Sequence, residues 1–359
     1  MRAQIEASLR HYIEPHLQCD LITAKAVKEL RVDAGRITLT LALGFPCRSW
    51  RDDLRNSLQF LLQKIAGVVA VDIQIETTIT AHAVQNGLRG LDAVKNIIVV
   101  ASAKGGVGKS TTAVNLALAL QAEGAQVGLL DADIYGPSQP MMLGVTQQPE
   151  VVAQQKIKPL LAHGLQTMSI GYLVDQTDAM IWRGPMVTRA LQQLFVDTLW
   201  QDLDYLVIDL PPGTGDIQLT LAQKIPVAGA VIVTTPQDIA LADARRGIKM
   251  FEKVKVPVLG VIENMSGYIC DHCGHSNSIF GEGGGAKLAA AHQVRLLGQI
   301  PLTAAIRADT DSGRPTMVAA PESLAAKAYA KIALNTAAQL ALQVKNQTIK
   351  FPKIVVESL

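Results

Sequence analysis

The sequence predicts an α/β protein in which a small α+β domain precedes a doubly wound, mostly parallel sheet. Its 359 residues exceed one ordinary domain, which favours one large domain with a smaller one. Apolar residues make up 49% of the chain and aromatic residues only 4%, so Val, Ile, Leu and Ala must fill the core, as in strands covered by helices on both faces. From Asn96 onward short apolar runs alternate with amphipathic segments, the pattern of a doubly wound sheet.

The small domain is expected at residues 1–80, as a helix, two strands, a helix and a strand. The strands are expected near 24–32, at 36–43 and at 68–77. The second helix has a stripe of apolar residues: Trp50, Leu54, Leu58, Leu61 and Ile65. Ser49 and Asp52 resemble a capping box at its start, and Gly67 ends it. A linker is expected at 81–95.

The large domain is expected at 96–345, followed by a tail at 346–359. Its strand-like runs are NIIVVA, QVGLLD, YLVIDL, GAVIVTT, VLGVIEN and RLLGQI. Residues 149–184 are expected to form short extended pieces and loops, and residues 322–343 a helix. In doubly wound sheets ligands bind at the carboxyl ends of the strands, so functional residues are expected directly after these runs.

Charge and hydropathy argue against nucleic acid or membrane as partners. The formal net charge is +2, and the densest basic run, residues 244–256, has its charges at the spacing of a solvated helix face. The N-terminus lacks the apolar stretch of a secretory signal, and the longest apolar run is too short to span a bilayer. A cytoplasmic location is expected.

The stretch KGGVGKST, residues 104–111, predicts a phosphate-binding loop between a strand and a helix. Its glycines let backbone N–H groups face phosphate oxygens at a helix N-terminus. Lys109 then reaches the β- and γ-phosphates, and the Ser110 hydroxyl ligates Mg²⁺. The expected nucleotide contacts are Gly105, Gly106, Val107, Gly108, Lys109, Ser110 and Thr111. The general pattern has glycine where this chain has Ala103, which implies slight strain if that position needs a positive φ.

Carboxylates follow two further strands. Asp133 is a candidate to orient the attacking water, and Asp131 either shares that role or caps the turn before Gly136. Asp209 ends a run typical of a Walker B strand, where the carboxylate contacts Mg²⁺ through water. The glycine-rich loop 211–215 that follows it is suited to sensing a γ-phosphate. Together these motifs predict nucleotide hydrolysis.

These residues resemble the deviant Walker A ATPases, which include MinD, ParA and the nitrogenase iron protein. The mark of that superfamily is the early lysine, here Lys104, and the resemblance implies that it reaches the phosphates of a partner chain in a homodimer. DADIYGPSQP, WRGPMV, VIDLPPGTGD and ENMSGYICDHCG, in this order, resemble the Mrp/ApbC group of iron–sulfur cluster carriers. The resemblance implies that Asn264 contacts adenine and that the nucleotide is ATP. Arg183 either contacts the partner or starts a helix.

Cys270 and Cys273 form a CxxC pair whose thiolates suit zinc or an iron–sulfur cluster. Two ligands do not complete a site, so either His272 or His275 completes a zinc knuckle or a second chain supplies two more thiolates. A purely structural or redox-active dithiol is the remaining alternative. The resemblance favours the second: a 4Fe-4S cluster bridging a homodimer. Cys19 and Cys47 lie far away in the sequence and are interpreted as buried or idle thiols.

The leading hypothesis is an ATPase that carries a labile cluster, receives it from donor proteins and transfers it to apo-proteins. A positioning switch of the MinD or ParA type is an alternative, but it calls for a basic or amphipathic surface that the tail does not clearly supply. A zinc-clamped targeting ATPase is the other alternative. The residues do not decide between zinc and iron.

Overall fold

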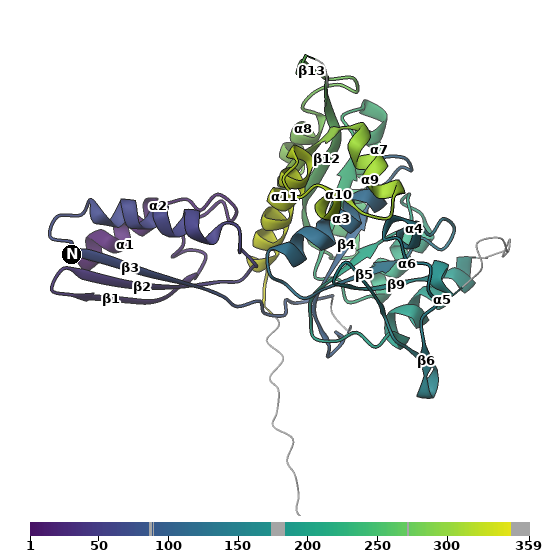
Figure 1. Ribbon diagram of the computed structural model, residues 1–359, viewed down its shortest axis with the longest axis horizontal. Helices are drawn as coiled ribbons and strands as arrows, with labels where there is room; N and C mark the ends of the chain where they lie inside the picture. The colour runs from purple at the N-terminus through teal and green to yellow at the C-terminus, as the bar shows by residue number, and fades with distance from the viewer. Residues whose placement is uncertain (86–87, 89, 174–183, 271–272, 346–359) are drawn as a thin grey trace, which may run out of the picture.

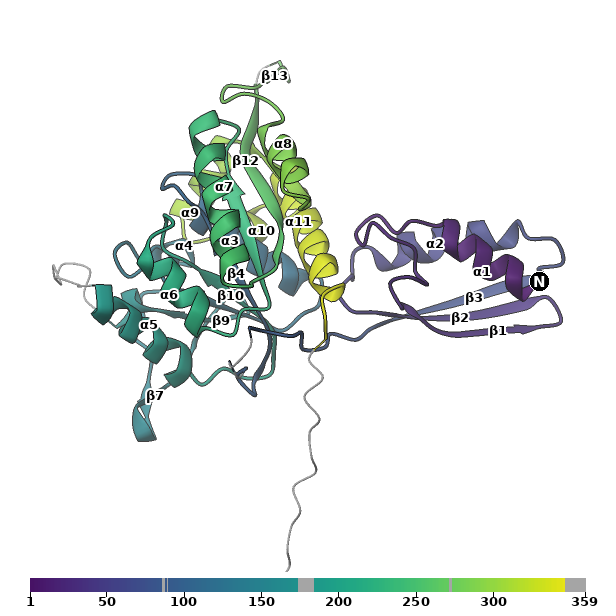
Figure 2. The same ribbon diagram turned by 180° about the vertical axis from the view of Figure 1, so that it is seen from behind.

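The computed structural model describes residues 1–85, 88, 90–173, 184–270 and 273–345. A three-stranded sheet belongs to an N-terminal unit, and a nine-stranded sheet forms the centre of a main unit that runs from β4 to α11. The N-terminal unit stands out to one side of the main unit (Figures 1 and 2). The predicted α/β class, with a small α+β unit before a mostly parallel sheet, is confirmed.

The N-terminal unit has the predicted order of elements. They are α1 (Arg2–His11), β1 (Val27–Asp33), β2 (Arg36–Leu43), α2 (Arg51–Gln63) and β3 (Ala70–Thr77). The central strand β2 pairs antiparallel with β1 and parallel with β3. Because side chains alternate along a strand, Ile37, Leu39 and Leu41 all point to one face and are buried with Leu54 and Leu58 of α2 in one core.

The start of α2 differs from the prediction. Its N-cap is Trp50, with no side-chain cap hydrogen bond. Ser49 instead donates two hydrogen bonds to the carboxylate of Glu123 in the main unit, from its backbone N (2.8 Å) and from Oγ (2.5 Å). The predicted capping box between Ser49 and Asp52 is therefore wrong. Trp50 is the N-cap, and the Ser49 hydroxyl donates to a carboxylate that is distant in the sequence.

The main unit contains all six predicted strands, and its sheet is larger than those six. Its strands are β4 (Val94–Ala101), β5 (Val127–Asp131), β8 (Leu160–Ala162), β9 (Leu165–Ser169), β10 (Leu203–Asp209), β11 (Gly229–Thr234), β12 (Val258–Ile269), β13 (Ser276–Asn277) and β14 (Leu296–Leu302). The order is β13-β12-β11-β4-β10-β5-β9-β8, and β14 pairs with β12. Among the strands of this sheet that the structure describes, only β8 with β9 and β12 with β13 are antiparallel.

The segment predicted to hold short pieces and loops adds to this sheet. Strand β9 pairs parallel with β5, and β8 folds back beside it. The described part of the segment also contains a separate two-stranded ribbon and two short 3₁₀ turns: β6 (Val151–Val152), η1 (Ala153–Gln155), β7 (Lys156–Ile157) and η2 (Ile170–Tyr172). Residues 174–183 of the segment lie outside the described residues. Short strands without a long apolar run carry too little periodic signal to be assigned to a sheet from sequence.

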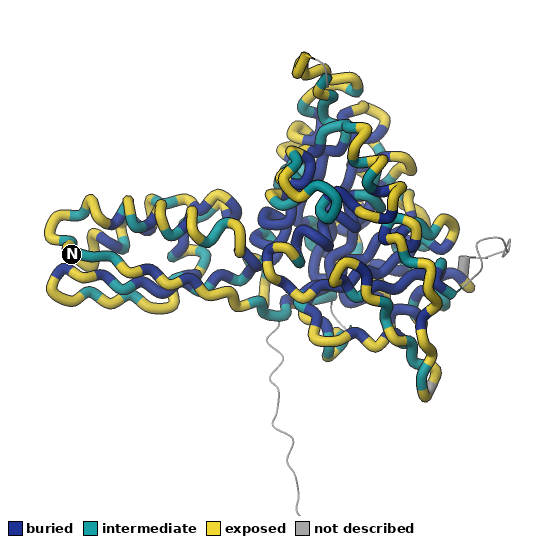
Figure 3. Tube along the Cα trace, viewed as in Figure 1, coloured by how far each residue is buried: buried dark blue, intermediate teal, exposed yellow. Residues whose placement is uncertain are grey.

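Helices cover both faces of the main sheet (Figures 1 and 2). They are α3 (Lys109–Ala122), α4 (Gln139–Met142), α5 (Gly184–Asp197), α6 (Asp216–Lys224), α7 (Asp238–Lys253), α8 (Gly284–Ala291), α9 (Ala304–Asp311), α10 (Thr316–Ala319) and α11 (Leu324–Ala341). In β4, Ile98 and Val100 share a core with α3 and α11, whereas Ile97 and Val99 share another with α5, α6 and α7. Buried residues are concentrated in this sheet and its helices (Figure 3).

Two properties of the helices bear on partners. The basic run predicted as a solvated helix face lies on α7, where Arg245, Arg246 and Lys249 are exposed while Ile248 and Phe251 are buried. Within the described part of the chain, none of the helices combines the length and the apolar character needed to cross a bilayer.

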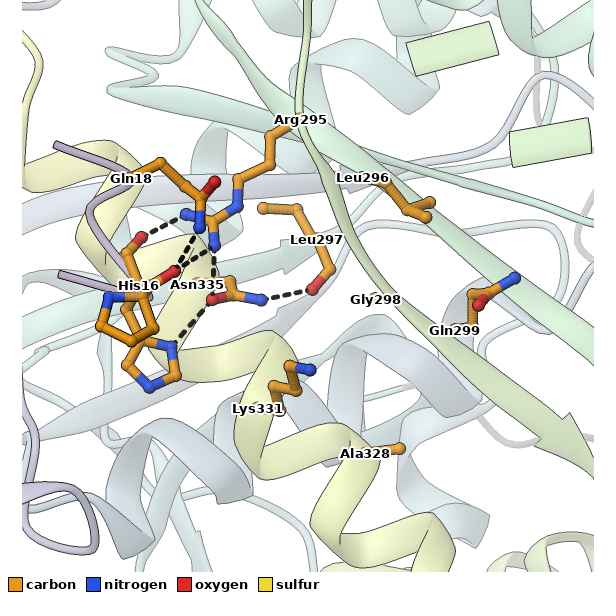
Figure 4. Close-up of a pocket in the computed structure, with 11 residues that line it drawn as sticks. His16, Gln18, Arg295, Leu296, Leu297, Gly298, Gln299, Ala328, Lys331 and Asn335 are labelled. Carbon is orange, nitrogen blue, oxygen red and sulfur yellow. Dashed lines mark hydrogen bonds between the residues drawn. The ribbon is translucent and has the colours of Figure 1, made fainter. Parts of the chain in front are cut away.

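A polar cluster joins the two units (Figure 4). Arg295, just before β14, donates to the backbone carbonyls of His16 and of Pro15, the latter at 2.9 Å. Oδ1 of Asn335, on α11, accepts from Arg295 (2.9 Å) and from Nδ1 of His16 (2.8 Å). A cavity of about 580 Å³ opens beside this cluster. The cluster fixes the loop after α1 against β14 and α11.

Candidate functional site

The predicted phosphate-binding loop lies between β4 and α3. Strand β4 runs parallel to β10 on one side and to β11 on the other, so the carboxyl ends of the three strands meet around the loop. Asp209 is the last residue of β10, and Asn264 lies in β12, beyond β11. The topology thus brings to the phosphate-binding loop two residues, Asp209 and Asn264, that follow it by about a hundred residues or more in the chain.

The backbone of the loop shows why it needs glycine. Gly106 and Gly108 have φ values of 81° and 80°, which side chains rarely allow. A Cβ on Gly108 would also lie 2.2 Å from Nδ2 of Asn264, which donates a 2.9 Å hydrogen bond to the Val107 carbonyl. Ala103 is not among the residues with positive φ, so the strain considered at that position is absent.

Lys109 and Asp209 form a buried ion pair at the start of α3. Their side chains are 6% and 0% exposed, and the Lys109 ammonium also lies 3.1 Å from Oγ of Ser110. A buried charge needs a partner, and in this structure the lysine that would hold phosphate is neutralised by the carboxylate. The Ser110 hydroxyl and the Asp209 carboxylate are the hard oxygen ligands that Mg²⁺ prefers, so the donor set fits that ion.

Gln139 is a member of this site that sequence reasoning missed. It is 1% exposed, and its Nε2 donates to Oδ2 of Asp209 (2.9 Å) and to the Ser110 carbonyl (3.1 Å). It therefore holds the Asp209 carboxylate against the first turn of α3. The only sequence signal for Gln139 is its place in the stretch DADIYGPSQP, and this stretch gives no reason to choose Gln139 over its neighbours.

Asp131 and Asp133 have different environments. Asp131 is fully buried and accepts from the N–H groups of Asp133, Ser138 and Gln139 and from Oγ of Ser169, each at 3.1 Å. Burial, with the nearby charge of Asp209, raises the pKa of Asp131 to about 7. Asp131 thus has the turn-capping environment that was one of its two predicted roles.

Asp133 is half-buried, and burial raises the pKa of its carboxyl as well. Its own backbone N–H is engaged by Asp131, and its carbonyl accepts from the N–H of Gly136 at 3.3 Å. The Asp133 side chain therefore projects from a turn whose backbone is held by these two hydrogen bonds.

Asp131→Asn is expected to destabilise the fold by about 1–3 kcal/mol. Both carboxylate oxygens accept from N–H groups, so the amide of Asn must turn its own NH₂ toward at least one donor and leave it unpaired. Urea unfolding followed by circular dichroism measures the change. Asp202→Asn, at an exposed position, is the matched control and should leave the midpoint unchanged.

The remaining residues of the phosphate-binding loop are exposed or half-buried. Lys104, Gly105 and Gly106 are exposed, and Thr111 is half-buried in the first turn of α3. Within the described residues the Lys104 ammonium has no ion pair, while its carbonyl accepts a 2.9 Å hydrogen bond from Oγ of Ser102. The early lysine therefore points to no partner within the described part of its own chain.

The loop after β10 contacts the phosphate-binding loop. Gly213, with a φ of 108°, donates from its N–H to the Ser102 carbonyl at 2.9 Å. Gly215 is the N-cap of α6. One backbone hydrogen bond therefore holds the loop before α6 against the end of the segment that leads into the phosphate-binding loop.

The CxxC pair lies at the end of the molecule, on the hairpin between β12 and β13 (Figure 1). The Cys270 N–H donates to the His275 carbonyl at 2.9 Å, and the N–H of Gly274 donates to the Cys270 carbonyl at 2.9 Å. Cys270 is half-buried and Cys273 exposed. These two backbone bonds connect Cys270 to Gly274 and His275, on the far side of Cys273 in the sequence.

The other cysteines lie in the N-terminal unit. Cys47 is buried and Cys19 half-buried, burial raises the pKa of both thiols, and none of the four cysteines forms a disulfide. Across the described residues no group of three His, Cys, Asp or Glu side chains is placed to hold a metal ion. His275 is described and exposed, while His272 and Arg183 lie outside the described residues.

A parallel sheet, a glycine-rich loop before a helix and a Walker B carboxylate define a P-loop nucleotide-binding protein. The model of the family described as NUBPL iron-transfer P-loop NTPase matches residues 93–337, and that of an iron–sulfur cluster assembly protein matches residues 2–89. The chain belongs to the iron-transfer P-loop NTPase family. The resemblance read from its motifs is confirmed at that level.

Individual relatives agree. The chain is 51% identical over 341 residues to an iron–sulfur cluster carrier protein of Escherichia coli K12, covering 95% of this chain and 92% of that protein. A nucleotide-binding protein of Archaeoglobus fulgidus in complex with ADP is 37% identical, with a TM-score of 0.55 over 62% of this chain and 88% of that one. The cell division ATPase MinD of Pyrococcus furiosus is 25% identical, with a TM-score of 0.51 over 67% and 97%.

Proposed function

We propose that the protein binds and hydrolyses ATP and carries a 4Fe-4S cluster, which it transfers to apo-proteins. The observation that carries this proposal is the presence in one chain of a phosphate-binding loop and of a thiol pair, half-buried Cys270 and exposed Cys273, on a hairpin of the same sheet. Its membership of the iron-transfer family and its similarity to proteins named as cluster carriers support it.

At the phosphate end of the nucleotide, we assign binding of the phosphates to Lys109 and binding of hydrated Mg²⁺ to Asp209, the two members of the buried ion pair. When nucleotide binds, the Lys109 ammonium turns from Asp209 to the β- and γ-phosphates. This frees the carboxylate to hold the water shell of Mg²⁺, with Ser110 as a direct ligand and Gln139 holding Asp209 in place. Asp133, on its fixed turn, is the proposed group that orients the attacking water.

The base end of the nucleotide is assigned to Asn264. Its amide nitrogen donates a hydrogen bond to the Val107 carbonyl of the phosphate-binding loop. In the proposed adenine contact, Asn264 either keeps this bond while it also bonds to the base or gives it up for a bond to the base. The neighbouring positive-φ residue, Met265, marks a break in the β12 ladder that gives this segment an irregular backbone at the site.

Lys104→Ala is expected to abolish most ATP hydrolysis while leaving much of the nucleotide affinity intact. In the proposed homodimer Lys104 reaches the phosphates of the partner, and this contact is complete only in the closed assembly. Hydrolysis and nucleotide affinity, measured on the same preparation, separate the two effects. A Lys104→Ala protein that hydrolyses ATP normally contradicts the assignment and makes Lys104 a surface lysine.

At the thiol end, we propose that Cys270 and Cys273 of two chains supply the four cysteine ligands of one cluster. The exposure of Cys273 on a hairpin at one end of the main unit supports a site shared between chains. The alternative is a zinc site within one chain, in which His275 or His272 completes the ligands supplied by the two cysteines.

Anaerobic reconstitution with iron and sulfide tests the carrier function. The loaded protein is expected to hold about four iron and four sulfide per dimer and to restore activity to the apo form of a 4Fe-4S enzyme. A protein that takes up zinc and no iron, or that holds a cluster and never passes it on, contradicts the proposal.

A further inference from the structure

The cavity beside the Asn335 cluster is lined by both units of the chain. Its volume is about 580 Å³, which is in the range of pockets that hold small organic ligands. The loop after α1 forms one wall, the first half of β14 with the residue before it forms a second, and α11 forms a third. A molecule in this cavity therefore contacts the N-terminal unit and the main unit at once.

The charged side chains in the lining of the cavity are both positive. They belong to Arg295 and Lys331, and none of the described residues that line the cavity is acidic. The other polar side chains of the lining are three amides and one imidazole: Gln18, Gln299, Asn335 and His16. Because this lining brings no negative charge, its electrostatic potential favours an anion.

Arg295 is held in place by neutral acceptors. Its guanidinium donates to two backbone carbonyls and to Oδ1 of Asn335, and these bonds leave the Nε–H and one terminal N–H without an acceptor among the described residues. Burial lowers the pKa of Arg295, and the charge of Glu14 opposes that effect. The Glu14 carboxylate lies outside the cavity lining and accepts from Leu17 and Trp50. A half-buried guanidinium whose orientation is fixed in this way is suited to bind a carboxylate or a phosphate.

Lys331 supplies the second positive charge, from α11. Ala328, Lys331 and Asn335 recur at helical spacing, and Figure 4 shows Lys331 and Asn335 on the side of α11 that faces β14. Lys331 is exposed and forms no hydrogen bond or ion pair within the part of the chain that the structure describes. Lys327, one turn earlier, instead pairs with Glu322 at 3.5 Å. The Lys331 ammonium is therefore available to a ligand.

The cavity is separate from the phosphate-binding loop. Strands β12 and β11 lie between β14 and β4, which puts the start of β14 about 14 Å across the sheet from the loop that follows β4. No residue of that loop lines the cavity. An anion in the cavity is therefore a different ligand from a nucleotide at the loop.

We propose that this cavity binds a small organic anion through the Arg295 guanidinium and the Lys331 ammonium. The ligand class is a free small molecule with carboxylate or phosphate groups, and its carbon skeleton packs against Pro15, Leu296 and Ala328. Because both units line the cavity, the bound anion stabilises their docking by mass action. The proposal depends neither on ATP hydrolysis nor on the cluster.

The first test is calorimetry of the full chain with two probes, citrate for carboxylates and inorganic phosphate for phosphates. The titrations are run at about 150 mM salt, which screens charges at the open surface. At least one probe is expected to bind with a Kd below about 1 mM, and the probe that binds identifies the group. The absence of binding by both probes overturns the proposal.

Variants on the exposed face of α11 test the assigned charge without disturbing the core. Lys331→Ala is expected to weaken binding of the probe at least about fivefold, and Lys331→Arg, which keeps the charge, to retain it. Lys327→Ala is the matched control and should bind like the wild type, because Lys327 does not line the cavity. Equal losses in Lys327→Ala and Lys331→Ala would show a diffuse charge effect and overturn the site.

Hydrogen exchange locates the bound probe and separates the cavity from the phosphate-binding loop. The probe is expected to slow exchange in the loop after α1 and at the start of β14, in the wild type and in Lys327→Ala but not in Lys331→Ala. Protection confined to the first turn of α3 would place the anion at the phosphate-binding loop and contradict the proposal.

Discussion

Lys109→Ala should lower ATP hydrolysis by at least about tenfold, equivalent to about 1.4 kcal/mol of transition-state stabilisation. The lysine is the buried cation at the start of α3, and its removal takes away the charge that faces the β- and γ-phosphates. Steady-state turnover at saturating ATP measures the loss. Normal turnover in a folded variant contradicts the site assignment.

The same change leaves Asp209 as a buried, unpaired carboxylate, which by itself destabilises the fold. Asp209→Asn is the second variant: it removes the carboxylate and leaves the Lys109 ammonium without its ion-pair partner, retains the shape of the side chain and should also lose at least about tenfold in turnover. Lys224→Ala, at the exposed end of α6, is the matched control. A thermal unfolding scan of each protein shows whether a loss of turnover comes from a loss of structure.

The double variant Cys270→Ala with Cys273→Ala should hold essentially no iron after reconstitution, since the proposed dimer then supplies none of the four proposed thiolate ligands. It should still hydrolyse ATP, because the hairpin tip is a separate extension of β12 beyond the phosphate-binding loop. Iron and sulfide analysis and turnover are measured on one sample. Cys19→Ala, in the N-terminal unit, is the control and should load normally; iron retained by the double variant contradicts the assignment.

The sequence predicts the fold and the phosphate-binding loop well because their signals are local. Apolar runs such as the one ending at Asp209 specify strands, and the glycines before Lys109 specify a loop conformation whatever surrounds them. Asn264, by contrast, could be chosen only through the family resemblance. Its hydrogen bond to Val107 joins residues 157 apart in the chain, which no short pattern encodes.

The two site features that the sequence did not predict, the role of Gln139 and the contact of Ser49, both depend on residues that are far apart in the chain. Gln139 reaches Asp209 across 70 residues, and Ser49 reaches Glu123 across 74, so both contacts depend on how the finished sheet and helices pack. The Ser49 case also shows why a correct local motif can mislead. Ser49 precedes the helix as a cap residue would, but the N-cap is Trp50, and both the N–H and the hydroxyl of Ser49 donate to the carboxylate of Glu123.

The mixed dimer tests the central claim, a cluster shared between two chains, most directly. A chain carrying both Cys270→Ala and Cys273→Ala is paired with a wild-type chain, isolated through two different tags and reconstituted with iron and sulfide. Two thiolates cannot hold the cluster, so the mixed dimer should contain essentially no iron, while the wild-type dimer loads fully. A mixed dimer that retains half the metal, as zinc, would show that each chain has its own complete site and would contradict the shared cluster.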